Sequence, residues 1–337
     1  MKAIILEGPE KIAVDQVAEP TATANQALLR VRMVGLCGSD LNSFRGNNPL
    51  VRYPRILGHE IAATIEEKVE GCPHLQRGVP VTLSPYTSCN RCAACLRGRP
   101  NACQFNETMG VQRDGALTEY ILAPPEKLFP ADLSIQELCM VEPLTVGFHA
   151  VARGRVSASD TVAVFGCGGV GLGAVAAAGY RGARTIAIDV DDKKLHTARQ
   201  AGATDTIHTG KEALHDRLMK LTDGRGPDVA IEAIGLPETF LAAVQEVAYT
   251  GRVVYIGYAK HPVSYETRFF VQKEIDILGS RNALPEDFAA VIRMLQAKQF
   301  PLEEAVSAIV SLDEVPDIFT RWNSNPAKYT KIMVQVG

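Results

Sequence analysis

The sequence predicts an α/β protein in which a β-rich part precedes a doubly wound parallel sheet. The first third consists of short apolar runs separated by turn residues, and strands alternate with helices from about residue 142. A glycine-rich turn lies where the first strand of this alternation meets its helix. Such alternation is typical of a parallel sheet with helices on both faces. A chain of 337 residues is also long enough for about two domains.

The β-rich part contains apolar runs at 27–34, 61–69 and 79–83, which we interpret as strands. The first run alternates imperfectly between apolar and polar residues. Gly-Asn-Asn-Pro at 46–49 and Pro-Pro at 124–125 indicate loops.

In the alternating part, Pro143 is expected in the first turn of a helix that continues to about residue 152, because proline is favoured there. A further helix at 286–298 and a final strand at 331–336 follow the alternation. The elements expected between them are strand 161–165, a helix from 169, strand 185–188, a helix from 193, strand 229–234, helix 238–248 and strand 253–256.

Composition excludes several classes of protein. Lys and Arg number 35 against 38 Asp and Glu, which gives a net charge of −3 and argues against a nucleic-acid binder and a polybasic membrane surface. The uncharged stretch 161–180 has the length of a membrane span. Its six glycines favour instead a buried strand that leads into a helix.

The cysteines predict a reducing compartment. Eight in a chain of this length are too few for a disulfide scaffold, and five of them are placed like metal ligands. The N-terminal segment reaches Glu7 too early for the apolar region of a signal peptide. We therefore expect a cytoplasmic protein without a membrane partner.

A dinucleotide site is predicted at Gly166-Cys167-Gly168-Gly169-Val170-Gly171, which fits G-x-G-x-x-G. The motif follows a predicted strand and opens a predicted helix, as this fingerprint requires. Gly166 permits the tight turn, Gly168 the approach of a pyrophosphate, and Gly171 close helix–strand packing, while Gly169 and Val170 begin the helix whose free N–H groups face the phosphates. The alternative is a glycine-rich turn without a ligand.

Asp189, 18 residues after Gly171, favours NAD over NADP. A carboxylate at the end of the second strand accepts the ribose hydroxyls of NAD and repels a 2′-phosphate. Lys193 and Lys194 weaken the prediction because either can reach a phosphate. A solvated acid at a strand end is the alternative for Asp189.

Four cysteines, Cys89, Cys92, Cys95 and Cys103, have the spacing C-x2-C-x2-C-x7-C. Four thiolates close a tetrahedral zinc site and leave no position for chemistry, so we predict a structural zinc that holds a lobe together. An iron–sulfur cluster is the alternative.

A second set of ligands is more dispersed. Cys37, the His59-Glu60 pair and Glu142 offer a thiolate, an imidazole and carboxylates, which suit a zinc that keeps one position open for substrate. Taken singly, each has a structural interpretation: a small buried hydrophobe, a core histidine, or an acid at a helix start.

With both ligand sets and the dinucleotide motif in this order, the chain resembles the zinc-dependent medium-chain dehydrogenases from end to end. Glu142-Pro143-Leu144 resembles the sorbitol/threonine dehydrogenase branch. The resemblance implies a GroES-like β catalytic domain at 1–145 and 281–337, with the zinc lobe at about 86–104. A Rossmann domain at 146–280 would be inserted between its two parts.

The resemblance also implies roles for individual residues. Cys37, His59 and Glu142 would surround the catalytic zinc, with Glu60 as an alternate ligand. Asp40 would orient His59, and Ser39 would be the first hydroxyl of a proton relay. The family commonly ends that relay at a histidine, where this chain has Asn42. Two zinc ions per chain, NAD and a homodimer or homotetramer are implied as well.

The substrate is the least determined feature. Arg281 and Asn282 follow the last expected Rossmann strand, and Arg45 is a second basic candidate for binding a carboxylate or hydroxyls. Gly-Ser-Arg-Asn at 279–282 resembles sugar-acid and polyol dehydrogenases such as those acting on L-galactonate or L-gulonate at C5. We therefore expect a secondary alcohol of a polyol or aldonate to be oxidised. A threonine-type amino-alcohol dehydrogenase and a non-catalytic sensing protein on the same fold are the alternatives.

Overall fold

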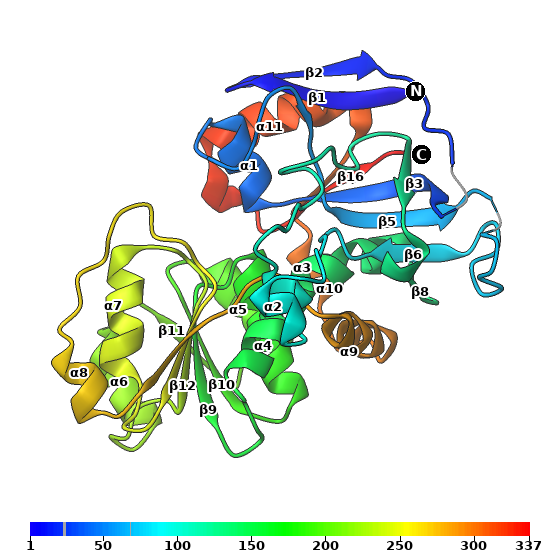
Figure 1. Ribbon diagram of the computed structural model, residues 1–337. Coiled ribbons are helices and arrows are strands. Elements are labelled where there is room, and N and C mark those ends of the chain that lie inside the picture. The colour runs from blue at the N-terminus through cyan, green and yellow to red at the C-terminus, as the bar shows by residue number, and fades with distance from the viewer. Residues whose placement is uncertain (23–24, 68) are drawn as a thin grey trace. The chain divides into compact units, whose positions relative to one another are not determined.

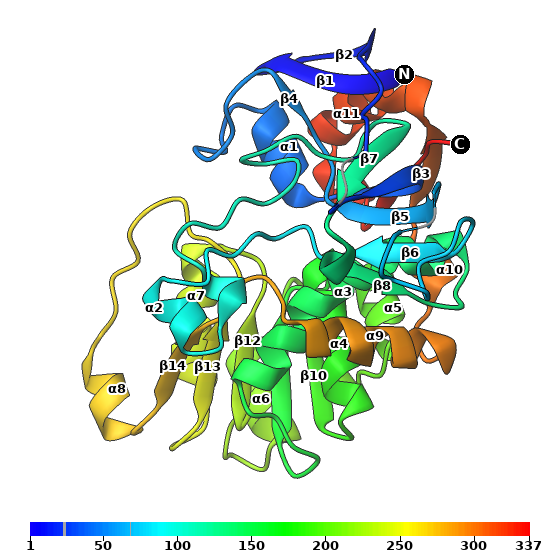
Figure 2. The same ribbon diagram turned by 45° about the vertical axis from the view of Figure 1, so that its right-hand side comes forward.

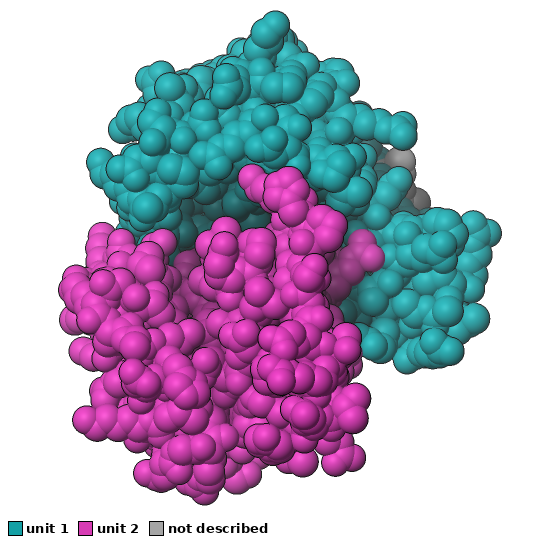
Figure 3. Space-filling model, turned by 90° about the vertical axis from the view of Figure 1, so that its left-hand side faces the viewer, with its two compact units in different colours: residues 1–142, 284–296, 305–337 teal, residues 143–283, 297–304 magenta. Residues whose placement is uncertain are grey.

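The computed structural model describes residues 1–22, 25–67 and 69–337, which form two compact units (Figure 3). Unit 1 comprises residues 1–142, 284–296 and 305–337, and unit 2 comprises residues 143–283 and 297–304. Unit 2 is thus inserted into the chain of unit 1. Residues 297–304 cluster with unit 2, although the sequence prediction placed them in the same domain as the final strand.

Unit 2 contains a sheet of six parallel strands in the order β11-β10-β9-β12-β13-β14 among its described residues. The first strand, β9, lies in the middle, and the chain builds outward from it first on one side and then on the other (Figure 1). This order is that of the Rossmann fold. The strands are β9 (Thr161–Phe165), β10 (Arg184–Asp189), β11 (Asp205–His208), β12 (Val229–Glu232), β13 (Arg252–Tyr255) and β14 (Asp276–Gly279).

Helices connect and cover these strands (Figures 1 and 2). Helix α4 packs on β9 and β10, α5 on β10 and β11, and α7 on β12 and β13. Because both faces are covered, β9 and β12 are almost entirely buried and carry apolar runs rather than alternating residues. The helices are α4 (Gly169–Tyr180), α5 (Asp192–Gln200), α6 (Leu214–Leu221), α7 (Pro237–Glu246) and α8 (Arg268–Gln272).

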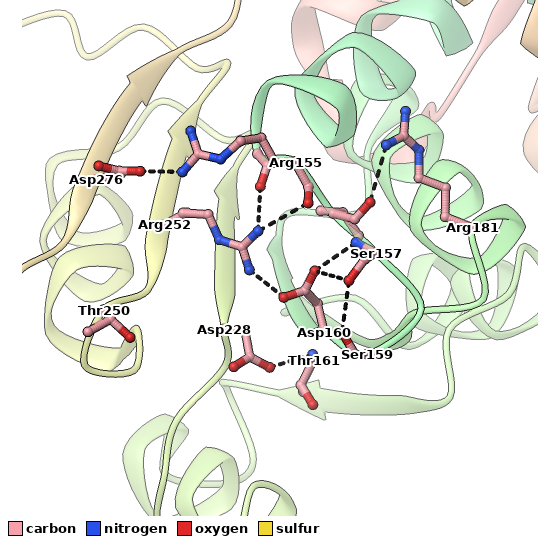
Figure 4. A network of polar contacts seen from close by, with 12 residues as sticks. Arg155, Ser157, Ser159, Asp160, Thr161, Arg181, Asp228, Thr250, Arg252 and Asp276 are labelled. Carbon is pink, nitrogen blue, oxygen red and sulfur yellow. Dashed lines mark hydrogen bonds and ion pairs between the residues drawn. The ribbon is translucent and has the colours of Figure 1, made fainter.

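A polar network joins the N-terminal ends of the strands in unit 2 (Figure 4). Arg252 at the start of β13 forms an ion pair with Asp160, which precedes β9, and donates to the carbonyl oxygens of Gly154 and Arg155 at 2.9 and 3.1 Å. Asp160 accepts the N–H and hydroxyl of Ser157 at 2.7 and 3.0 Å. Burial alone would raise the pKa of Asp160, but the donors of Ser157 and Arg252 outweigh it and lower that pKa.

Unit 1 is built on a largely antiparallel sheet in the order β15-β16-β3-β5-β6-β8, with β7 also paired to β3, and on a small sheet β2-β1-β4. Its core consists of inward-facing strand residues such as Leu29, Ile61 and Val81, all fully buried. The strands are β1 (Lys2–Gly8), β2 (Lys11–Gln16), β3 (Ala27–Leu36), β4 (Arg55–Ile56), β5 (Glu60–Ile65), β6 (Pro80–Leu83), β7 (Tyr120–Ala123), β8 (Leu128–Pro130), β15 (Ala308–Ser311) and β16 (Ile332–Gln335).

Helices α1 and α11 of unit 1 contact each other, and α11 also contacts β2 and β15 (Figure 2). Phe44 of α1 packs against Phe319 of α11 with ring centroids 5.3 Å apart. Helix α3 continues from unit 1 into unit 2, and its last residue in unit 1 is Glu142. The helices are α1 (Gly38–Phe44), α2 (Ala93–Leu96), α3 (Ile135–Arg153), α9 (Pro285–Gln296), α10 (Leu302–Ala305, mostly in unit 2) and α11 (Val315–Ser324).

The predicted fold class is confirmed, and most expected strands and helices coincide with observed ones within a few residues. Strand 161–165 is β9, and the uncharged stretch is β9 followed by α4. Expected strand 61–69 was too long, since β5 ends at Ile65; Lys68, within that run, lies outside the described residues. Among the described helices, none combines the length and apolar character needed to cross a membrane.

The predicted start of a helix at Pro143 was wrong. Helix α3 begins at Ile135, and Pro143 lies inside it. The helix is started by a capping box, in which Glu137 accepts the N–H and hydroxyl of Ser134 and the Glu137 N–H returns a bond to that hydroxyl. Because of this earlier start, Glu142 is not an acid at a helix N-terminus but lies on a continuous helix.

Candidate metal centres and dinucleotide site

Strand pairing brings together three of the four residues predicted to surround the catalytic zinc. Cys37 follows β3, and Glu60 begins β5; the two strands are antiparallel, with Gly35 opposite Glu60. As a result, one ligand atom each of Cys37, His59 and Glu60 lie within 4.8 Å of one another. Residues separated by 22 positions in the sequence thus form a compact group of potential metal ligands.

Glu60 is held by a buried lysine that sequence reasoning did not find. The ammonium of Lys331 lies 2.6 and 2.5 Å from the two carboxylate oxygens and 3.2 Å from the carbonyl oxygen of Leu36. Burial lowers the pKa of Lys331, but the negative charges of Glu60 and Cys37 and the hydrogen bonds to Glu60 together outweigh burial and raise that pKa. A Cβ on Gly35 would lie 2.1 Å from a Glu60 oxygen, so the pair needs glycine there.

Asp40 and Ser39 lie on α1 beside Cys37. One Asp40 oxygen accepts the Cys37 N–H at 2.8 Å, and the other faces Nδ1 of His59 at 3.9 Å, which is beyond hydrogen-bond distance. Burial lowers the pKa of His59, but Asp40 and Cys37 outweigh it and raise that pKa well above its usual value. Among the described residues, the buried Ser39 hydroxyl has no hydrogen-bond partner.

Glu142 is buried on α3, close enough for the charges of His59 and Glu60 to act on its pKa. It is not one of the three residues whose ligand atoms lie within 4.8 Å of one another. It accepts a hydrogen bond from the hydroxyl of Tyr86, a second residue that no motif had indicated. Burial, together with the nearby charge of Glu60, raises the pKa of Glu142 to about 7.

The donor set fits a divalent cation. Asp40, Glu60 and Glu142 contribute three buried carboxyl groups beside the thiol of Cys37, and Lys331 forms an ion pair with one of them, Glu60. Burying this many acidic groups is costly without further positive charge. Nδ1 of His59, moreover, is buried without a hydrogen-bond partner in the described part of the chain. Thiolate, imidazole and carboxylate together are zinc ligands.

The four cysteines of the lobe converge. The sulfur of Cys92 lies 3.6 Å from that of Cys95 and 3.9 Å from that of Cys103. Zinc–sulfur bonds of about 2.3 Å in a tetrahedron place the sulfurs about 3.8 Å apart, so the cluster fits a structural zinc. Hydrogen bonds from the backbone N–H groups of Cys95 and Gln104 lower the pKa of Cys92 to about 6, which favours the thiolate.

The glycine-rich motif has the geometry of a dinucleotide fingerprint. Gly166 has φ of +92°, which favours glycine, and a Cβ on Gly171 would lie 1.8 Å from the Gly166 carbonyl oxygen. A Cβ on Gly168, the N-cap of α4, would meet nothing within 4 Å. This open space is what a pyrophosphate at the helix N-terminus requires.

Asp189 ends β10, as predicted, and its carboxylate turns toward the motif. It accepts the N–H of Cys167 at 2.8 Å and that of Val190 at 2.7 Å. Lys194 lies on α5, and its backbone N–H bonds to Asp191, the N-cap of that helix.

The predicted substrate residues are placed differently from one another. Arg281 and Asn282 follow β14 in unit 2. Arg45 in unit 1 donates to the side chain and carbonyl oxygen of Asn323 at 2.7 and 3.0 Å. The guanidinium of Arg45 thus contacts α11 through Asn323, and its role in binding substrate stays a prediction.

Comparison with known proteins shows the family of the chain. Residues 23–133 match the family described as alcohol dehydrogenase GroES-like domain, and residues 169–297 match the family described as zinc-binding dehydrogenase. A sorbitol dehydrogenase of Bacillus subtilis is 33% identical over 99% of this chain and 97% of its own. An L-galactonate-5-dehydrogenase of Escherichia coli K12 is 32% identical over 88% and 87%. A starvation-sensing protein of the same strain is 29% identical over 99% of both chains.

Two solved structures share the fold over nearly the whole chain. A short chain alcohol dehydrogenase of Escherichia coli CFT073 complexed with NADH has a TM-score of 0.91, with 27% identity over 99% of both chains. A zinc-binding dehydrogenase of Sinorhizobium meliloti 1021 bound to NADP has a TM-score of 0.91, with 29% identity over 99% and 98%. The chain therefore belongs to the zinc-type alcohol dehydrogenase family.

Proposed function

We propose that this enzyme transfers hydride from a secondary alcohol of a polyol or sugar acid to NAD. The observation that carries the proposal is the close group of Cys37, His59 and Glu60 in unit 1 of a chain whose unit 2 has the dinucleotide fingerprint. The names of the sorbitol and L-galactonate relatives support the substrate class.

Cys37, His59 and Glu142 are the proposed ligands of the catalytic zinc. We keep Glu142 as the carboxylate ligand because the resemblance to the sorbitol/threonine dehydrogenase branch implies it. Glu60, whose two oxygens contact Lys331, is the alternate ligand. When bound there, zinc lowers the pKa of a coordinated hydroxyl, as it lowers that of water from 15.7 to about 7. The residues of the lobe, Cys89, Cys92, Cys95 and Cys103, would hold a second zinc.

Ser39 is the proposed first acceptor of the alcohol proton, because its buried hydroxyl lies two residues from Cys37. Asn42 cannot act as a base, so the proton continues to water, a cofactor hydroxyl or another residue. We expect Ser39→Ala to lower kcat by about 10–10³-fold, which overlaps the range of about 10²–10⁴-fold for losing a general-base path. Cys37→Ser should abolish turnover. Equal losses in both variants would contradict this ranking.

NAD supplies the hydride acceptor, and Asp189 is proposed to bind its adenosine ribose. Arg281 and Asn282 are proposed to bind the substrate. If Arg281 binds a carboxylate, Arg281→Ala should raise KM for aldonates and leave KM for neutral polyols unchanged.

The test is a screen of polyols, aldonates and amino alcohols with NAD, followed by NADH absorbance, in protein assayed to contain two zinc ions per chain. Turnover with a polyol or aldonate supports the proposal. Turnover with amino alcohols alone would favour a threonine-type enzyme. Absence of turnover with all three classes would favour a sensing role, a second candidate that rests on the name of one relative.

The proposal also includes a cytoplasmic location and assembly into a homo-oligomer. None of the eight cysteines forms a disulfide, which suits the reducing cytoplasm. The outer strand β14 is largely exposed and, among the described residues, pairs only with β13. An open strand edge of this kind is a template for pairing. We propose a homodimer or homotetramer, to be measured by light scattering; a monomer at micromolar concentration would refute it.

A further inference from the structure

Tyr86 links the four-cysteine lobe to Glu142. Its hydroxyl donates to the Glu142 carboxylate, and the two side chains come from segments 56 positions apart. Tyr86 is 6% exposed and Glu142 is 3% exposed, so water does not readily replace this bond. Tyr86 itself offers no acidic or thiolate ligand to a metal, so its relation to the site is through Glu142.

Tyr86 belongs to the base of the lobe. Residues 85–87 run beside residues 107–109: the Met109 N–H donates to Pro85 at 3.1 Å, and Tyr86 forms an isolated antiparallel bridge with Thr108. The Glu107 N–H donates to the Thr87 hydroxyl at 2.7 Å. The four cysteines lie between these two segments in the sequence, so the lobe is a loop closed at this base.

We propose that Tyr86 is a positioning residue that fixes the Glu142 carboxylate for metal binding, and that the lobe base holds Tyr86 in place. A carboxylate turns readily about its terminal bond, and a fixed donor restricts that rotation. Donors to metal ligands commonly change metal affinity or activity by about 10–100-fold when removed. The inference rests on the proposed catalytic zinc, but it concerns metal binding and needs no substrate.

The first experiment compares Tyr86→Phe with the wild type. Both proteins are loaded with Co²⁺, and the metal at the one-thiolate site is distinguished from that at the four-thiolate site by its absorption. We expect Tyr86→Phe to bind metal at the Cys37 site about 10–100-fold more weakly in chelator competition, with the four-thiolate spectrum unchanged. Unchanged affinity and spectrum at the Cys37 site would overturn the proposal.

Thr82→Val is the matched control. The Thr82 hydroxyl is also fully buried and donates to a carbonyl oxygen, that of Ile61, at 2.8 Å. It is four residues from Tyr86 but does not contact Glu142 through this bond. Metal affinity in Thr82→Val should stay near the wild-type value. A loss as large as that in Tyr86→Phe would show a general effect of buried hydroxyls and refute a specific role.

A double variant tests whether Tyr86 acts through Glu142. In the Glu142→Gln background, Tyr86→Phe should cause less than a threefold further change in affinity, because the partner is already altered. A full additional loss would refute the route through Glu142.

Thr87→Val tests the lobe. It loosens the base at the Glu107 contact and leaves both Tyr86 and Glu142 intact, so a loss of several-fold at the Cys37 site supports the coupling. Wild-type affinity there would refute the part assigned to the lobe base. If the substrate screen fails while these affinities change as expected, the inference stands and the proposed reaction fails.

Discussion

Replacing Lys331 by Met should destabilise unit 1 strongly, because it leaves Glu60 without its counter-charge. The ammonium contacts both carboxylate oxygens at 2.6 and 2.5 Å, and the two side chains are 4% and 2% exposed. Removing one partner of such a buried pair costs about 3–5 kcal/mol. For a unit of this size, each kcal/mol lowers Tm by about 2–4 °C, so a decrease of about 6–20 °C is expected.

The chain offers a selective probe of this unit. Trp322, the only tryptophan, is buried in α11 of unit 1, 5.9 Å from the ring of Phe319. Its fluorescence during urea unfolding of the zinc-loaded protein therefore reports the free energy of unfolding of unit 1.

Lys2→Met is the matched control. Lys2 pairs with Asp313 at 2.8 Å, but the side chains are 45% and 61% exposed. An exposed pair contributes at most about 1 kcal/mol. In the double variant with Glu60→Gln, the uncompensated charge is removed, and much of the loss caused by Lys331→Met should be recovered. Equal losses in the two lysine variants, or no recovery in the double variant, would refute the reasoning.

Three further predictions concern unit 2. Asp189→Ala should lower kcat/KM for NAD by at least tenfold and raise kcat/KM for NADP, measured from initial rates with both cofactors. An unchanged preference for NAD would show that Asp189 does not bind the ribose. Gly171→Ala should destabilise unit 2 by about 1–3 kcal/mol, because the added methyl group overpacks the contact between helix and strand. Gly168→Ala should leave Tm unchanged and weaken NADH binding, measured by fluorescence titration. Equal Tm values for the two variants would contradict the geometry of the motif. Because the pKa of Asp160 is lowered in the fold, its stabilisation is present above the ordinary aspartate pKa of about 3.9 and is lost as pH falls through the lowered value. We therefore expect the urea midpoint of Arg252→Gln, measured by circular dichroism, to fall less steeply between pH 5 and pH 3 than that of the wild type. If the midpoints of both proteins fall equally steeply with pH, this ion pair is excluded as a cause of the loss.

Features coded by neighbouring residues were predictable from the sequence. The cysteine ligands of the lobe lie within fifteen residues, and the dinucleotide fingerprint lies within six. Residues this close in sequence are brought together by short loops, and their contacts do not depend on how the rest of the chain folds. The start of α3 was missed although Ser134 and Glu137 have capping-box spacing, because Pro143 gave a competing signal for a helix start.

Contacts made by sheet pairing could not be predicted. Lys331 reaches Glu60 only because β16 pairs with β3, with Ile332 opposite Leu36. Tyr86 reaches Glu142 only because the base of the lobe lies against α3. A lysine at the start of an apolar strand and a tyrosine after a proline carry no local signal for either contact, so both residues emerged from the structure alone.

One irregularity connects the imperfect alternation of β3 with the chemistry of unit 1. Val31 pairs with Ala63, but Met33 pairs with Ala62, so Arg32 is an extra residue on β3. Without this bulge, Val34 would stand opposite Glu60 in place of Gly35. Even a Cβ atom on Gly35 would collide with the Glu60 carboxylate, so a valine opposite Glu60 would not fit. Bulges shift register and re-aim side chains near functional sites. The broken alternation at 31–34, which looks like weak strand patterning in the sequence, is thus what allows Glu60 and its lysine to fit beside Cys37.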